Sequence, residues 1–327
     1  MMSEVALRDV IKIPESEMVN GSSSNGSLTK PHVETTDENI EIQKKKVSSL
    51  VDQRDGTENS GLEGPTPEVE YVESENLKDV EDVECCLKTL LSGLGSKDWV
   101  SVCDALNNVR RLSIYHKEAI VCMLSDVISL IVKSLKNPRS ALCKTAIMTS
   151  ADIFKAYNDE IIDSLDPLLV QLLLKSSQDK RFVCEAAESA LIALTSSISP
   201  LLLLPKLQPY VKNRNPRIRA KASMCISRSV PRLGVEGIQA YGIDNLIQIG
   251  ASQLSDQLPE SRDAARTLLL ELQSVYEKSH VPEPTTVSEE PVIASWENYC
   301  QSKLSPLSAQ AVLRVTNIAR EGLVSGL

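Results

Sequence analysis

The turn sequence Asn137-Pro138-Arg139 occurs a second time as Asn215-Pro216-Arg217, and this repetition decides the fold class. Three related polar breaks complete the series: Asp98-Trp99, Asp179-Lys180-Arg181 and Glu260-Ser261-Arg262. In chain order the five breaks recur about 40, 42, 36 and 45 residues apart. Each break ends one segment whose apolar residues lie three and four positions apart, and opens another that is rich in small residues. The chain therefore repeats a unit of two segments joined by a short polar turn.

The spacing of apolar residues within the segments predicts helices. Leu124, Ile131 and Leu135 lie on one such stripe, and no segment alternates in the way of a β-strand. The clearest second helices of the units are expected at 139–157, 181–198, 216–233 and 260–278. Helix pairs with a period near 40 residues are typical of HEAT and armadillo repeats, in which stacked pairs bury one continuous core. We therefore predict an all-α solenoid of about five helix pairs between residues 79 and 279.

Charge and composition divide the chain into parts. The 327 residues carry 35 basic and 44 acidic side chains, a formal net charge of −9. Residues 1–79 hold 17 of the acids and 8 of the bases, whereas residues 80–327 hold 27 of each. Residues 1–78 have too few apolar side chains to offset chain entropy, so we predict a disordered acidic tail. A proline-rich stretch at 280–291 predicts a linker before a last helical segment at 292–327.

Signatures of catalysis and metal binding are missing from the sequence. The three histidines are too scattered for a metal cluster, and none of the eight cysteines forms a Cys-x-x-Cys pair. Gly93-Leu94-Gly95 lacks the Gly-Lys-Ser/Thr ending of a phosphate-binding loop. Only 11 residues are aromatic, too few for the stacking platforms of single-strand nucleic-acid binders. No stretch has the length and apolar character of a membrane span. We expect a non-enzymatic cytoplasmic protein without metal or cofactor, and neither nucleic acid nor a membrane as its partner.

The turns inside successive helix pairs line up along one edge of such a solenoid, and here most of them are basic. The cations of this edge are Lys97, Lys136, Arg139, Lys180, Arg181, Lys212, Arg214 and Arg217. The stretch 206–232 holds eight Lys or Arg and no acid. Such a one-sided patch attracts an acidic partner, with a strength that falls as salt rises. Trp99, where a helix begins beside the first turn, either anchors that partner or folds back to seal the first helix pair.

Several of these motifs, taken in order, resemble the TOG domain, and most closely the amino-terminal domain family of CLIP-associating proteins (CLASP). They are Asp98-Trp99 with Leu106, Lys136-Asn137-Pro138-Arg139-Ser140, and Leu254-Ser255-Asp256 with Arg262-Asp263-Ala264-Ala265-Arg266. The resemblance covers roughly residues 79–278. It implies a flat paddle of HEAT repeats whose turns bind tubulin through a first-turn tryptophan and basic residues in later turns. Carried over residue by residue, it implies tubulin contacts at Trp99, Lys97, Arg139, Lys180, Arg181, Arg214 and Arg217.

Arg219 and Arg262 differ from the turn-tip arginines in their sequence setting. Each precedes an alanine by three residues, as in the generic HEAT pattern, where the arginine pairs within the stack. We therefore predict structural roles for these two, and tubulin contact for Arg214 and Arg217, which lie nearer the turn tip. Val102 stands where the family often has a basic residue. Because only one such domain is present, the avidity of polymerase-type tandem arrays is not expected.

Two hypotheses about function follow from the sequence. In the first, the chain is a cytoskeleton-associated tubulin- or microtubule-binding protein that regulates microtubule organisation or dynamics through the turns of its single TOG-like domain. In the second, it is a general HEAT-repeat scaffold that holds other proteins on its concave surface or on its last helical segment. That segment, 292–327 with Trp296, either caps the open end of the solenoid or binds a partner. A buried Trp99 and internally paired turn charges would favour the scaffold.

Overall fold

The computed structural model describes residues 71–280 and 295–324, and every regular element within these ranges is a helix. The prediction of an all-α chain is therefore confirmed for these ranges. Residues 1–70 of the predicted tail and residues 281–291 of the predicted linker lie outside the described residues. No helix in the described ranges is long and apolar enough to cross a membrane.

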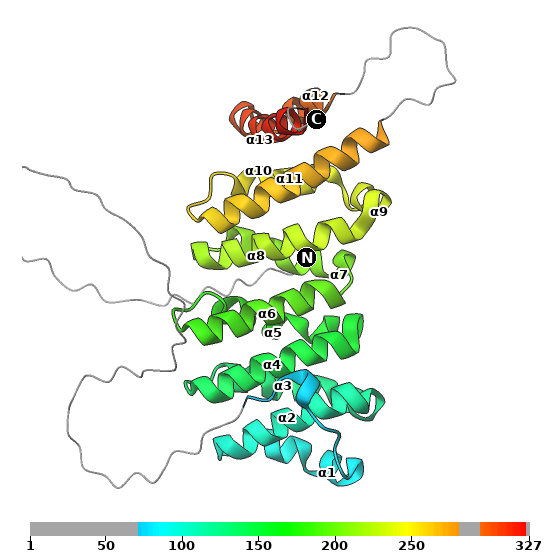
Figure 1. Cartoon of the computed structure of the whole chain (residues 1–327), viewed down its shortest axis with the longest axis vertical. Coiled ribbons are helices and arrows are strands. Elements are labelled where there is room, and N and C mark those ends of the chain that lie inside the picture. The colour runs from blue at the N-terminus through cyan, green and yellow to red at the C-terminus, as the bar shows by residue number, and fades with distance from the viewer. Residues whose placement is uncertain (1–70, 281–294, 325–327) are drawn as a thin grey trace, which may run out of the picture. The chain divides into compact units, whose positions relative to one another are not determined.

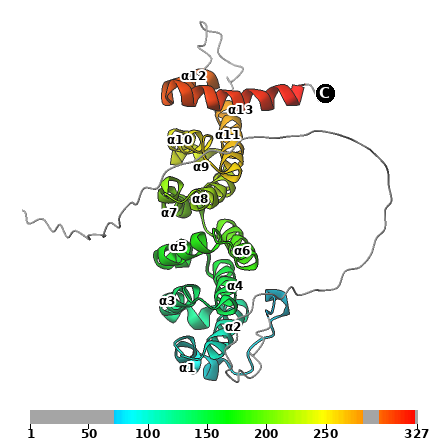
Figure 2. The ribbon, with the colours of Figure 1, turned by 90° about the vertical axis from the view of Figure 1, so that its left-hand side faces the viewer.

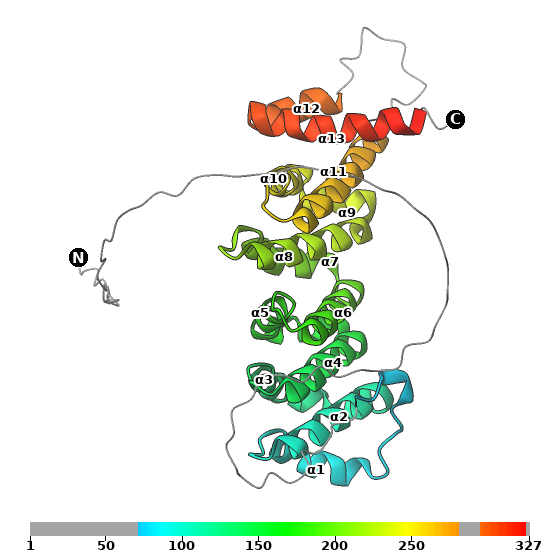
Figure 3. The same ribbon diagram turned by 60° about the vertical axis from the view of Figure 1, so that its left-hand side comes forward.

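Helix pairs follow one another from residue 83 to residue 279 and stack in two layers (Figures 1, 2 and 3). The first helices are α1 (Val83–Leu94), α3 (Leu124–Leu135), α5 (Leu165–Lys175), α7 (Pro200–Leu207) and α10 (Ile243–Gln253). The second helices are α2 (Trp99–Tyr115), α4 (Ser140–Tyr157), α6 (Arg181–Ser197), α8 (Pro216–Ser229) and α11 (Pro259–Ser279). The short helix α9 (Gly234–Tyr241) joins the fourth pair to the fifth. The predicted solenoid of helix pairs is confirmed.

Short 3-10 helices shape the connections between the elements of the stack. They are η1 (Ser74–Asn76), η2 (Lys117–Met123), η3 (Asn158–Ser164), η4 (Gln208–Lys212) and η5 (Val230–Leu233). Three of them, η2, η3 and η5, follow the second helix of a pair and lead into the next helix, on the edge opposite to the turns inside the pairs. The connections between pairs and the turns inside pairs therefore lie on two different edges.

Side-chain caps in the turns fix where the second helices begin. The Asp98 carboxylate accepts hydrogen bonds from the first backbone N–H groups of α2. The Asn215 side chain caps α8 by accepting from the backbone N–H of Arg217, at 3.0 Å. Asn137 accepts from the N–H of Arg139 at 2.9 Å, one residue before α4 begins, and so shapes this turn without capping the helix. The caps on α2 and α8 satisfy donors that a helix terminus otherwise leaves open. The four predicted second helices begin within one residue of the observed ones.

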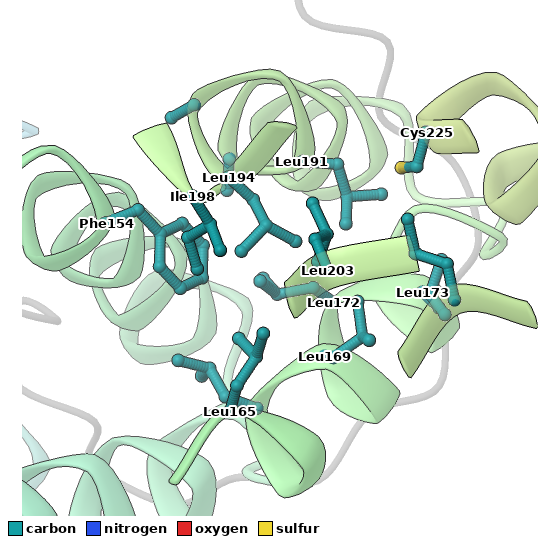
Figure 4. Close-up of a cluster of buried hydrophobic side chains, with 14 of the residues drawn as sticks. Phe154, Leu165, Leu169, Leu172, Leu173, Leu191, Leu194, Ile198, Leu203 and Cys225 are labelled. Carbon is teal, nitrogen blue, oxygen red and sulfur yellow. The ribbon is translucent and has the colours of Figure 1, made fainter. Parts of the chain in front are cut away.

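One hydrophobic core runs through the stack without a break between pairs. Figure 4 shows side chains from α4 to α8 meeting around α5. The buried members labelled there are Phe154, Leu165, Leu169, Leu172, Leu173, Leu191, Leu194, Ile198, Leu203 and Cys225. Burial of apolar surface stabilises by roughly 25 cal/mol per Å². Because no single pair covers its own apolar face, each pair depends on its neighbours for this burial.

The segment 71–82, which we call the N-terminal strap, packs on α2 and α4 and belongs to the folded unit. Its anchor is a buried ion pair: Arg110 Nε lies 2.7 Å from Asp152 Oδ2, and the two side chains are 1% and 2% exposed. Arg110 also donates to the carbonyl of Val72 at 2.8 Å. The Ser74 hydroxyl donates to Asp152 at 2.7 Å. Both charges therefore gain hydrogen bonds from the strap that partly offset their desolvation.

The predicted boundary of the tail at residue 78 needs correction. Leu77 is buried, and its carbonyl accepts a hydrogen bond from the Tyr115 hydroxyl at 2.7 Å. Asp79 lies 2.8 Å from His116 Nε2. Residues 71–78 therefore pack against the helix stack instead of belonging to the tail. The polar composition of the strap hides this, because buried Arg110 and Asp152 hold it through hydrogen bonds more than through apolar contact.

The last two helices, α12 (Trp296–Lys303) and α13 (Pro306–Val324), contact α10 and α11. Trp296 is 6% exposed, and its indole N–H donates to the Thr316 hydroxyl at 3.3 Å. The ring of Tyr276, on α11, lies 5.5 Å from that of Trp296. Lys303 pairs with Asp244 of α10 at 2.6 Å. These contacts favour the capping alternative over a detached helix, and we keep capping as a proposal.

Candidate functional site

The turns inside the five helix pairs form one edge of the stack, which Figure 1 shows at the starts of α2, α4, α6, α8 and α11. We call this surface the turn edge. It comprises residues 95–99, 136–140, 176–181, 212–217 and 254–260. All the residues that the sequence predicted to contact tubulin lie on it. Their environments differ from turn to turn.

Trp99 and Arg139 bring the first two turns together. The Trp99 ring is partly buried and packs against the core, while part of it stays accessible. The guanidinium carbon of the exposed Arg139 lies over this ring, 5.3 Å from its centroid. Such a cation–π contact holds the arginine in place while leaving its N–H groups directed to solvent. Trp99 thus has features of both roles left open by the sequence, since it helps to seal the first pair and remains at the surface.

Polar contacts continue from turn to turn along the edge. Lys180 Nζ donates to the Ser140 hydroxyl at 2.9 Å, which links the third turn to the second. Arg217 donates to the Ser177 carbonyl at 3.1 Å and to Asp179 at 2.6 Å, which links the fourth turn to the third. The hydrogen bond that Arg217 donates to the Asp179 carboxylate raises the pKa of the guanidinium above its ordinary value. The side chains of one turn are therefore positioned by the turn before it.

The fourth and fifth turns are joined by Arg219. Its Nε lies 2.6 Å from Asp256 Oδ2, and its Nη1 donates to the Asn213 carbonyl at 2.9 Å. Arg262 donates to the carbonyls of Asp256 and Gln257 within its own turn, at 2.7 and 2.9 Å. Both arginines that we predicted to be structural thus bond to groups of the stack. Arg181, in the third turn, is 90% exposed and pairs with Glu185 of the same helix at 2.8 Å.

Five cations on the turn edge form no ion pair or side-chain hydrogen bond with any described residue: Arg139, which lies over the Trp99 ring, and four more. These four are Lys97, Lys136, Lys212 and Arg214, and all of them are exposed. Lys97 and Arg214 are among the predicted site residues, whereas Lys136 and Lys212 are not. The sequence analysis placed these two among the cations of the edge but did not carry them over as tubulin contacts. The remaining turn-edge cations are bonded to groups of the protein. These four charges, together with Arg139, therefore give the edge its positive field.

The opposite edge of the stack differs in its electrostatics. There Lys117 pairs with Glu160 at 2.8 Å and Lys206 with Asp166 at 2.7 Å. Asp159 accepts from the backbone N–H of Ser199 at 2.6 Å. The charges named on that edge are neutralised within the protein. Cations near that edge such as Arg228 and Lys278 also have no ion-pair partner among the described residues, but the turn edge gathers five such cations beside the accessible part of Trp99 and is therefore the binding candidate.

A shallow hollow of about 390 Å³ opens on the turn edge between the third, fourth and fifth pairs. Arg181, Arg217 and Lys221 line it together with Asp179 and Glu260. Lys221 pairs with Glu188 at 2.5 Å. The mixed charges of the hollow suit a polar macromolecular surface more than a small apolar ligand.

The described ranges also bear on metal binding and on cysteine reactivity. No group of three or more His, Cys, Asp or Glu side chains there could hold a metal ion. Burial raises the pKa of the Cys225 thiol to about 12, so this cysteine stays a neutral hydrophobic group at physiological pH. The buried Arg110–Asp152 pair, which the sequence analysis missed, serves the strap. The sequence feature that could have indicated this pair is a charged residue at the equivalent core-facing position of each helix, α2 and α4, 42 residues apart.

The stack of helix pairs with a basic turn edge defines this molecule as a TOG-like HEAT-repeat protein, and solved structures bear out the fold. The MAST/Orbit N-terminal domain matches 71% of this chain and 96% of its own length, with a TM-score of 0.52 and 12% identity. A chain from work on tubulin recruitment by microtubule polymerases with TOG domain arrays matches 70% of this chain and 45% of its own length. Its TM-score is 0.51 at 15% identity. Such low identities show the shared fold alone.

The sequence match goes further and identifies the family. The CLASP N terminal family matches residues 111–280, just over half of the chain, and the chain belongs to this family. A curated relative is the human TOG array regulator of axonemal microtubules protein 1, which is 26% identical over 131 residues. That alignment covers 40% of this chain and 8% of the relative. The chain therefore matches only a small part of that much longer protein.

Proposed function

We propose that this chain binds tubulin or microtubules, without catalysis, through the turn edge of its single TOG-like domain, and so regulates microtubule organisation or dynamics in the cytoskeleton. The observation that carries the proposal is the row of exposed unpaired cations beside the Trp99–Arg139 contact. An acidic protein surface would meet these cations without first breaking an internal ion pair, which keeps the cost of desolvation low.

Membership of the CLASP N terminal family and the names of its relatives support this choice of partner. The human relative is named for axonemal microtubules, and one similar structure comes from work on tubulin recruitment. Within the edge, we assign direct contact to Trp99, Arg139, Lys97 and Arg214. Lys180, Arg181 and Arg217 have partners in the stack and reach the tubulin surface with part of their donors. Arg219 and Arg262 position the fourth and fifth turns.

A charge-reversal pair tests the assignment. The variant Lys97→Glu with Arg214→Glu changes two unpaired cations on the turn edge. The matched control, Arg228→Glu with Lys278→Glu, changes two exposed cations near the C-terminal ends of α8 and α11, which form no ion pair with described residues. Both variants shift the net charge equally. Microtubule pelleting and gel filtration with free tubulin measure binding, and circular dichroism checks that each variant folds.

We expect the turn-edge variant to lose about tenfold or more in affinity and the control to bind like the parent chain. Equal loss in both variants would show that net charge, not the edge, governs binding. Absence of binding by the parent chain at low salt would refute the proposed function itself.

One observation favours a second role, as a scaffold through the last helical segment. Leu307 and Ile318 on α13 are 80% and 64% exposed. They lie 11 residues apart, about three helical turns, and therefore on one face of the helix. Trp296, which the sequence suggested as a contact, is buried and cannot serve. If Leu307→Ser with Ile318→Ser abolishes capture of a protein partner that the turn-edge variant still binds, this role is supported.

A further inference from the structure

The N-terminal strap leads the chain to the turn edge. At residue 77 the strap lies beside the C-terminal end of α2, where Tyr115 bonds to the Leu77 carbonyl. At residue 71 it lies beside the beginning of α4, because Lys144 Nζ sits 4.1 Å from the centroid of the Tyr71 ring. Lys144 is four residues into α4, about 6 Å along the axis from the first residue. Followed from residue 77 back to residue 71, the strap therefore approaches the second turn of the edge.

The segment that precedes Tyr71 has the charge opposite to that of the turn edge. Between residues 47 and 70 the sequence contains a single base, Arg54, and six acids. The acids are Asp52, Asp55, Glu58, Glu63, Glu68 and Glu70. The net charge of this 24-residue segment is thus −5, more than half of the −9 of the whole chain. Two of these acids, Glu68 and Glu70, lie within three residues of the strap in the sequence.

The lengths of the segment and of the edge are compatible. An extended chain covers at most about 3.3 Å per residue, so 24 residues span up to about 80 Å. Helix pairs stack about 10 Å apart, so the five turns together extend over about 40 Å. The segment can therefore reach every turn from its attachment at Tyr71. Being tethered, it also has an effective concentration on the order of millimolar at the edge.

We propose that residues 47–70 dock on the turn edge of the same molecule, with their carboxylates at Lys97, Lys136, Lys212 and Arg214. These cations have no ion-pair partner among the described residues, and the segment supplies the complementary charge at the place where the strap begins. The docked segment shields the edge and competes with an acidic partner for it. The competition rests on the proposed function, whereas the docking itself does not.

Zero-length crosslinking of the full chain tests the docking without tubulin. A carbodiimide joins carboxylates to lysines only when they are in contact, and mass spectrometry locates the bonds. We expect crosslinks from residues 63–70 to Lys97 or Lys136, which decline as salt rises to about 0.5 M. A mixture of isotope-labelled and unlabelled protein separates bonds within one molecule from bonds between two copies. Crosslinks only between copies, or none to the turn edge, would overturn the proposal.

Two neutralised variants test the competition. In the first, the six acids from Asp52 to Glu70 become Asn or Gln. In the matched control, six acids farther from the strap are changed in the same way. These are Glu4, Asp9, Glu15, Glu17, Glu34 and Asp37. Both sets of changes lie outside the described residues and raise the net charge by six, and circular dichroism checks that each variant folds.

We expect the first variant to bind tubulin about threefold to tenfold more tightly than the parent chain at low salt, because the fraction of molecules with an open edge rises. The control should bind like the parent. Equal gains in both variants would mean that net charge alone acts, and no gain in either would mean that the segment does not compete. Either result, for a parent chain that binds tubulin, would overturn the proposed competition. If crosslinks form within one molecule while no variant binds tubulin, the docking stands and the proposed function fails.

Discussion

At the scale of single residues, Trp99 combines two properties that the sequence presented as alternatives. Its ring contributes to the core of the first pair, and its outer face supports Arg139. The stacked guanidinium keeps five N–H donors but loses much of its rotational freedom. Such an arrangement presents a positive group in one orientation, which reduces the entropy lost when an acidic partner binds.

Replacement of these two residues singly and together measures their coupling. We expect Trp99→Ala to lower the free energy of unfolding by about 2 kcal/mol, since a partly buried indole loses less than a fully buried one. Arg139→Ala alone should have a small effect. The double-mutant cycle should give a coupling of about 0.5–1 kcal/mol, as expected of a cation–π contact at the surface. Urea denaturation supplies all four values, and additivity would show that the contact contributes nothing.

The ion pair of Arg110 and Asp152 should behave differently from pairs on the surface. Asp152→Ala leaves the Arg110 guanidinium buried without its carboxylate and detaches Ser74 of the strap, so we expect a loss of about 3–5 kcal/mol. Lys206→Met breaks a pair whose carboxylate is 61% exposed, and should cost at most about 1 kcal/mol. Urea denaturation of both variants makes the comparison. Similar losses would mean that the strap does not depend on the buried pair.

At the scale of elements, the helices were predictable because their signals are local. Asp98 and Asn215 cap the helices that follow them within three residues, so the sequence places these starts correctly. The strap was not predictable in this way, because Val72 and Arg110 are 38 residues apart and their bond depends on the packing of α2. The same holds for the candidate site. All the turn cations are visible in the sequence, but only the fold shows that Arg217 pairs with the preceding turn and that Lys97 has no ion-pair partner among the described residues.

The docking of α12 onto α10 should depend on pH through Asp244. Hydrogen bonds from Lys303 and Tyr299 lower the pKa of this carboxyl below its usual 3.8. A group whose pKa is depressed by folding stabilises the folded state above its unfolded pKa and loses this contribution as pH falls through the folded value. We therefore expect the docking to weaken below about pH 4.

Fluorescence of Trp296 in a Trp99→Phe background reports this step, because Trp296 lies between α12 and α11. Asp244→Asn should remove the part of the acid transition that belongs to the docking while global unfolding remains. An acid transition that is the same with and without Asp244→Asn would assign it to other carboxyls.

At the scale of the whole molecule, the net charge of −9 describes the chain poorly. The excess of acids lies in residues 1–79, whereas residues 80–327 are balanced and place five exposed cations without an ion pair among the described residues on the turn edge. Contacts between successive turns hold the neighbouring cations Arg139, Lys180, Arg217 and Arg219 in place along this edge. A partner approaching the turn edge therefore meets a positive field, although the chain as a whole is negative.

Salt dependence of tubulin binding distinguishes the edge from the whole-chain charge. If the edge governs the encounter, affinity and association rate should fall as ionic strength rises from about 0.05 to 0.3 M, since screening weakens attraction between exposed charges. If the net charge governed it, screening would reduce repulsion between two acidic proteins, and affinity would rise. Stopped-flow mixing with fluorescent tubulin measures the rate, and the Lys97→Glu, Arg214→Glu variant should show a flatter salt dependence than the parent chain. A rise in affinity with salt for the parent chain would locate the binding surface away from the turn edge.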